Sequence, residues 1–138
     1  MQIHDLLLRQ LIIELTDPDP EKMVDNAIEQ WQLIAAHIIS IIGEGGFNAL
    51  YDRSVILTQS TFPWLLTCEL QPSAHKRFSA LRASLEDQTT ALASEANYLL
   101  LVNFTGILES LIGAELTTRI FRSALEETRI PIGKGVNK

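Results

Sequence analysis

The stretch that decides the fold runs from residue 41 to residue 54 and reads Ile41-Ile42-Gly43-Glu44-Gly45-Gly46-Phe47-Asn48-Ala49-Leu50-Tyr51-Asp52-Arg53-Ser54. A similar stretch follows late in the chain and reads Leu111-Ile112-Gly113-Ala114-Glu115-Leu116-Thr117-Thr118-Arg119-Ile120-Phe121-Arg122-Ser123. Each copy ends an apolar helical pattern at a glycine, starts a new helical pattern, and places an aromatic residue close to an Arg-Ser pair. We therefore expect two related helical halves, residues 1–69 and 70–138.

Apolar residues recur at three- and four-residue spacing along nearly the whole chain, which predicts an all-α fold. We expect a single domain built as a compact bundle of five or six helices. The expected helices span residues 2–15, 20–42, 47–60, from 72 or 73 to about 85, from about 91 to 112, and from 114 to about 127. Residues 86–90 lack proline and glycine, so the fourth and fifth helices could be continuous, but we favour a break there. Residues 131–138 are expected to fray.

Prolines and glycines set the expected helix boundaries. Pro18 and Pro20 break the chain after the first helix, and Asp19 is the expected cap of the second. Gly43 and Gly113 are expected to be left-handed caps with positive φ. A tight turn at residues 45 and 46 is expected before the third helix.

An offset of 70 residues aligns the two halves, helix for helix. It pairs Gly43 with Gly113, and a one-residue shift then brings Arg53-Ser54 onto Arg122-Ser123. Either a true internal duplication or the shared pattern of any two amphipathic helices explains this echo, and the sequence leaves both open.

Composition narrows the classes of function. The chain has 138 residues and a net charge of −6, which argues against binding to phosphate backbones and so against a nucleic-acid partner. The single Cys68 cannot form an intramolecular disulfide, which is typical of a reducing cytosol. No signal peptide is recognisable, and the most apolar run, residues 33–42, is short for a membrane span. We therefore expect a cytoplasmic protein that does not enter a membrane.

Four residues form the candidate binding site, namely Tyr51, Arg53, Arg119 and Arg122. If the halves pack about a pseudo-twofold axis, the arginines converge on a cleft that can bind an acidic ligand, because guanidinium groups grip carboxylates and phosphates bidentately. The alternative is that each arginine pairs with a nearby acid, as Glu115 and Arg119 can at i,i+4.

The motifs of catalysis and cofactor binding are not found in the sequence. We see no nucleophile beside a base, no metal-ligand spacing and no dinucleotide or Walker loop, so no catalytic residue, metal or cofactor is expected. The leading expectation is a non-enzymatic interaction module in bacterial-type regulation or signalling, with a protein partner. The alternatives are an anionic-ligand-binding domain that uses the arginine cleft, and an enzyme whose residues converge only in three dimensions. Because the helix over residues 2–15 is apolar on more than one face, a homodimer through it is also expected.

Overall fold

A computed structural model of the chain describes residues 22–65 and 74–124. Helix α2 spans Met23–Gln59, α3 spans Ala74–Glu86, α4 spans Thr90–Ile112, and a further helical stretch covers residues 114–124. No strand occurs in the two described ranges, so the all-α prediction is confirmed. A bundle of five or six helices is not established by these residues. Four expected features lie outside the described residues: the helix over residues 2–15, the break at residues 16–20, Cys68 and the tail from residue 131.

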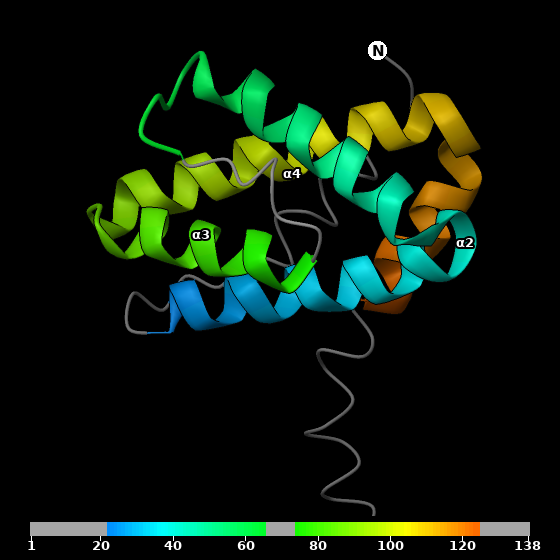
Figure 1. Cartoon of the computed structure of the whole chain (residues 1–138), viewed down its shortest axis with the longest axis horizontal. Coiled ribbons are helices and arrows are strands. Elements are labelled where there is room, and N and C mark those ends of the chain that lie inside the picture. The colour runs from blue at the N-terminus through cyan, green and yellow to red at the C-terminus, as the bar shows by residue number, and fades with distance from the viewer. Residues whose placement is uncertain (1–21, 66–73, 125–138) are drawn as a thin grey trace, which may run out of the picture.

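The helices pack side by side and bend at one end of the molecule (Figure 1). The first part of α2 and the whole of α4 run in the same direction, and both reach their bends at the right of the view. Helix α3 runs the opposite way, because its first residue lies against Glu44 and its later Arg82 lies against Asp25. The second part of α2 turns back from the bend toward the upper left of the view.

The bend in α2 occurs at Gly43, where φ is 86° and ψ is 163°. Gly113, at the end of α4, has nearly the same backbone angles, φ 93° and ψ 157°. The prediction of positive φ at both glycines is confirmed. The prediction of a left-handed helical cap is wrong, because that conformation needs ψ near 50°, whereas these angles fall in a region that is essentially restricted to glycine. We call Gly43 and Gly113 the elbow glycines.

Two of the expected helix boundaries are wrong, and the expected break between the fourth and fifth helices is confirmed. Helix α2 resumes directly after Gly43, so Gly45 and Gly46 are helical and do not form a turn. Its N-terminus lies at Met23, after a Lys22 cap that makes no side-chain hydrogen bond, and not at Pro20. The expected break between the fourth and fifth helices is confirmed, since α3 ends at Glu86 and Thr89 caps α4 by accepting a hydrogen bond from the Leu92 amide at 3.2 Å.

An aromatic cluster fills the core where α2, α3 and α4 meet. Trp31 is edge-on to Phe104 of α4 at 5.2 Å between ring centroids, and Phe78 of α3 lies 5.9 Å from Phe47. The buried Trp31 indole also donates a hydrogen bond from Nε1 to Oδ1 of Asn97 at 2.9 Å. Because these rings come from every part of the sequence, the cluster joins the three named helices into one core.

Residues 34–54 and 104–124 share nearly the same pattern of side-chain burial when they are aligned at an offset of 70. The pattern of buried, half-buried and exposed side chains agrees at every position except the pairs 44/114, 52/122 and 53/123. The same offset relates two backbone contacts, in which the hydroxyl groups of Ser40 and Ser110 each donate to a carbonyl oxygen three residues earlier at 2.7 Å. As far as the pair 51/121 the agreement needs no one-residue shift, and at the unshifted offset Asp52 aligns with Arg122, where the burial classes differ. We call these two segments the paired stretches.

Candidate functional site

Tyr51, the first of the predicted site residues, lies in the aromatic core. Its side chain is only 3% exposed. The ring stacks on Phe47 at 5.9 Å and stands edge-on to Trp31 at 5.3 Å. Tyr51 therefore packs the inner angle of the α2 bend instead of lining an open cleft.

The three predicted arginines are exposed on two different helices. Arg53 lies on the second part of α2, whereas Arg119 and Arg122 lie on the stretch 114–124. Arg119 faces Glu115 at 3.8 Å between Nη2 and Oε2, and the two side chains are 73% and 84% exposed. This is the i,i+4 pair that the sequence suggested, and such solvated pairs contribute little to stability. Ligand binding by the arginines stays a prediction.

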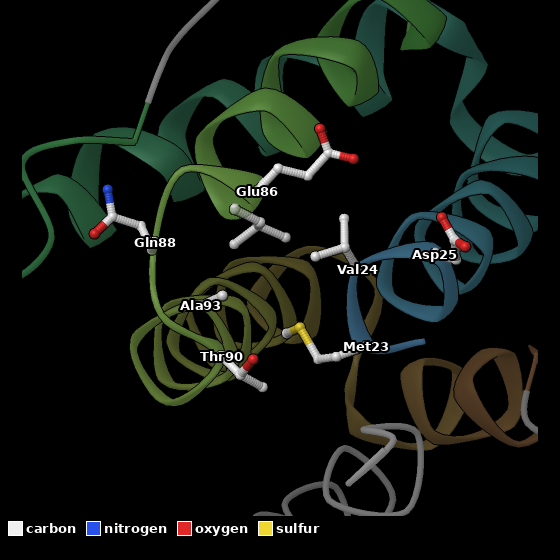
Figure 2. A pocket seen from close by; sticks show the side chains of 8 residues that line it. Met23, Val24, Asp25, Glu86, Gln88, Thr90 and Ala93 are labelled. Carbon is white, nitrogen blue, oxygen red and sulfur yellow. The ribbon is translucent and has the colours of Figure 1, made fainter. Parts of the chain in front are cut away.

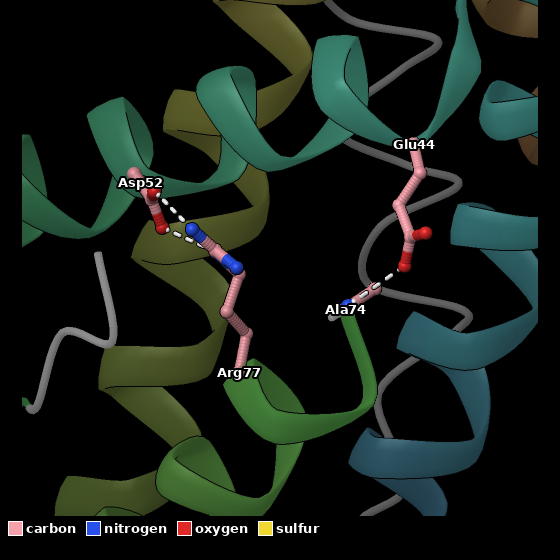
Figure 3. Close-up of polar contacts among 4 residues, drawn as sticks. All are labelled: Glu44, Asp52, Ala74 and Arg77. Carbon is pink, nitrogen blue, oxygen red and sulfur yellow. Dashed lines mark hydrogen bonds and ion pairs between the residues drawn. The ribbon is translucent and has the colours of Figure 1, made fainter. Parts of the chain in front are cut away.

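A different arginine forms the most buried ion pair given by the described residues. Arg77 of α3 donates from Nε to Oδ1 and from Nη2 to Oδ2 of Asp52, both at 2.7 Å, and Figure 3 shows this bidentate contact. The side chains are 4% and 19% exposed. This pair was not predicted from the sequence, although Arg77 is three residues after the inward-facing Ala74 and four before the inward-facing Leu81, a spacing that indicates the inner face of α3.

Glu44 supplies a second polar contact between α2 and α3. Its Oε2 accepts a hydrogen bond from the Ala74 amide at 3.0 Å (Figure 3). A carboxylate suits this place because the first amides of a helix have no partner within the helix and carry partial positive charge. Glu44 and Asp52 thus hold α3 at its first turn, and we call these two contacts the α3 clamp.

A hollow of about 340 Å³ opens at the opposite end of α3 (Figure 2). Its wall combines apolar side chains with the carboxylates of Asp25 and Glu86. Both carboxylates face the exposed Arg82, whose Nη1 lies 2.8 Å from Asp25 and 3.4 Å from Glu86. The hydrogen bond to Asp25 raises the pKa of Arg82 above its ordinary value. The lining residues are Met23, Val24, Asp25, Leu85, Glu86, Gln88, Thr90 and Ala93.

A smaller hollow of about 160 Å³ lies between the first part of α2 and α3, beside His75 and Gln32. Neither hollow contains any of the four predicted site residues. In the described ranges, no three His, Cys, Asp or Glu side chains are grouped so that they could hold a metal ion.

Apolar side chains are exposed beside both elbow glycines. Ile41 is 47% exposed and Leu111 is 63% exposed, and each precedes its glycine by two residues. The two bends lie at the same end of the molecule (Figure 1). Exposure of a large aliphatic side chain forgoes the stabilisation that burial provides, roughly 1.5–3 kcal/mol for full burial. We call Ile41 and Leu111 the elbow surface.

Two helices, α2 and α4, are long and apolar enough to cross a membrane by length and composition. This is weak evidence, because the core helix of a soluble protein passes the same test. Both helices contribute buried residues to the core described above. The expectation that the chain does not enter a membrane therefore stays a prediction.

Comparison with known proteins identifies no relative of this chain. No protein-family model matches the chain, and no curated protein or solved structure shows detectable similarity to it.

Proposed function

We propose that the chain is a non-enzymatic helical interaction module that binds a protein partner through the elbow surface. The observation behind the proposal is the repeated exposure of a large apolar side chain at equivalent places, Ile41 and Leu111, at one end of the fold. Single exposed apolar residues are common and need no explanation. Ile41 and Leu111 differ from such isolated residues, because they occupy equivalent positions beside two similar bends and neither side chain is buried.

The other exposed apolar residues in the described ranges do not repeat in this way. Leu92 is exposed, but its counterpart 70 residues earlier is Lys22. Ile56 and Leu57 are exposed, but their counterparts are Glu126 and Glu127. Among residues 22–65 and 74–124, only Ile41 and Leu111 are exposed large apolar side chains that match one another at this offset, which favours a role for the pair over chance exposure.

The proposal includes the finer architecture and setting expected from the sequence. The paired stretches belong to two pseudo-symmetric halves of a bundle of five or six helices, and the chain works in the cytoplasm as a regulatory module. Support for the halves comes from the shared burial order and the nearly equal backbone angles at the elbow glycines. A pseudo-symmetric module presents two similar apolar contacts, which suits a partner that offers two similar pockets.

Site-specific photo-crosslinking in the native host tests this function. A photoreactive side chain at position 41 or 111 should give a discrete adduct with the same partner, and Asp substituted at the other elbow position should abolish it. Positions 56 and 92 are the matched controls, because Ile56 and Leu92 are also exposed and apolar. Adducts that form equally at the control positions, or none at either elbow position, would reject the elbow surface as a binding site.

A further inference from the structure

The hollow of about 340 Å³ lies where the first turn of α2, the end of α3 and the first turn of α4 meet (Figure 2). These helix ends are at the end of the molecule away from the two bends and the elbow surface (Figure 1). The volume is at the lower end of the range of small-molecule sites, about 300–1,000 Å³. The hollow is therefore large enough for a ligand of a few non-hydrogen atoms.

The charged side of the hollow carries one negative charge in excess. Oδ1 of Asp25 and Oε2 of Glu86 share a single guanidinium nitrogen, Nη1 of Arg82, at 2.8 Å and 3.4 Å. The second oxygens of the two carboxylates accept no hydrogen bond from the described residues. Lys22 and Asp87, which neighbour the lining in the sequence, carry opposite charges and offset one another. Two carboxylates against one guanidinium thus leave room for one more cation.

The rest of the wall is suited to an alkyl chain. Figure 2 shows the carboxylates of Asp25 and Glu86 on one side of the hollow, with the apolar side chains of Met23, Val24 and Ala93 beside them. Met23 and Ala93 are buried and Val24 is half-buried, so this wall is the outer edge of the core. Each methylene group that is fully buried against such a wall favours binding by about fourfold. An inorganic cation gains nothing from it, so the wall favours an organic cation.

We propose that this hollow binds a small aliphatic amine, with the ammonium group between Asp25 and Glu86 and the alkyl chain along the apolar wall. A primary ammonium group has three N–H donors and no acceptor, so it can donate to the second oxygens of both carboxylates while Arg82 keeps its contacts. The amine is protonated at pH 7, because an alkylammonium group has a pKa of about 10.4, as in lysine. An anionic ligand is disfavoured, because the excess charge of the hollow is negative.

An NMR titration of the full-length chain with butylammonium chloride, at pH 7 and constant ionic strength, tests the proposal. Amide signals of the lining residues should shift with a dissociation constant of about 1 mM. Butan-1-ol, which has the same alkyl chain without the charge, should bind at least threefold more weakly, and Asp25→Asn should weaken butylammonium binding by about three- to tenfold. Glu115→Gln is the matched control, because it removes the same charge from another exposed carboxylate that faces an arginine, and it should leave binding unchanged.

Two further variants separate a built site from a general effect of charge. Arg82→Gln removes the cation that shares both carboxylates, so butylammonium binding should become about threefold tighter or more. Val24→Phe narrows the hollow and leaves its charge unchanged, so binding should be lost. Circular dichroism should show that each variant keeps the helical content and the melting temperature of the wild type to within a few degrees.

Three results would overturn the proposal. Butan-1-ol binding as tightly as butylammonium would reduce the hollow to an apolar site, and equal effects of Asp25→Asn and Glu115→Gln would remove the role of its carboxylates. A lysine blocked at both ends, Nα-acetyl-lysine methylamide, carries the same alkylammonium group. If it bound more tightly than butylammonium, the hollow would belong to a lysine side chain of a protein partner and not to a free amine. None of these variants alters the elbow surface, so the outcome is independent of the crosslinking test.

Discussion

Replacement of Arg77 by methionine should destabilise the fold by about 2–3 kcal/mol. Loss of one partner of a buried ion pair costs about 3–5 kcal/mol, because the other charge stays buried without compensation. The Asp52 side chain is 19% exposed, so water can solvate part of its carboxylate and the expected cost falls somewhat below that range. Methionine preserves much of the aliphatic stem, so the change falls mainly on the polar contacts of the guanidinium group, which include the two hydrogen bonds of 2.7 Å to Asp52.

Urea denaturation followed by circular dichroism measures this cost, with an unchanged m-value as the check that the same cooperative unit unfolds. The double variant Arg77→Met with Asp52→Leu should recover stability to within about 1 kcal/mol of the wild type, because it removes both buried charges. Arg119→Met is the matched control, and its exposed pair with Glu115 predicts a loss below about 0.5 kcal/mol. The reasoning is refuted if Arg77→Met costs no more than Arg119→Met, or if the double variant is as unstable as the single one.

Three further predictions concern the stability of the backbone and the core. Alanine at either elbow glycine should destabilise the fold by about 1–3 kcal/mol, because φ near 90° with ψ near 160° disfavours any Cβ. As a control, Gly106→Ala within α4, where a Cβ meets no atom within 4 Å, should stabilise the fold by roughly 0.5–1 kcal/mol, and equal urea midpoints for these variants would contradict the prediction. Trp31→Phe should destabilise the fold by about 2–3 kcal/mol, because it removes the indole hydrogen bond to the buried Asn97 and leaves a void. A thermal-unfolding measurement in which the free energy of unfolding falls by less than about 0.5 kcal/mol would count against this. Thr89→Ala should cost about 1 kcal/mol through loss of the α4 cap, and Thr89→Ser, which retains the hydroxyl group, should not.

Helix positions could be predicted from the sequence because apolar spacing and glycines are local signals. The ends of α3 and α4 were placed within a residue or two, and positive φ at the elbow glycines was anticipated. The turn expected at Gly45 and Gly46 was wrong because two adjacent glycines weaken a helix without breaking it, and packing of the following residues on the core outweighs that penalty. Apolar character alone would place Leu57 on the inner face, but Leu57 is exposed, and the neighbouring Thr58 is buried and accepts a hydrogen bond from Asn103 at 3.0 Å.

The α3 clamp could not be predicted, because its partners lie 25 and 30 residues apart and belong to helices whose relative placement the sequence does not encode locally. Arg77 follows His75 and Lys76, and a short basic run of this kind is typical of an exposed helix face. Its helical phase with Ala74 and Leu81 pointed inward, and that signal was available. Charge alone suggested the surface, whereas phase and charge together would have indicated a buried pair.

The register of the paired stretches bears on the predicted arginine cleft. Such a cleft needs Arg53 and Arg122 at equivalent positions, and that equivalence requires a shift of one residue. The burial order needs no shift as far as Tyr51 and Phe121, but the classes differ at the next position, where Asp52 is half-buried and Arg122 is exposed. At the offset of 70, Asp52 aligns with Arg122, and Asp52 holds Arg77 of α3. The two stretches thus carry opposite charges at this aligned position, and ligand binding by Arg53, Arg119 and Arg122 stays a prediction.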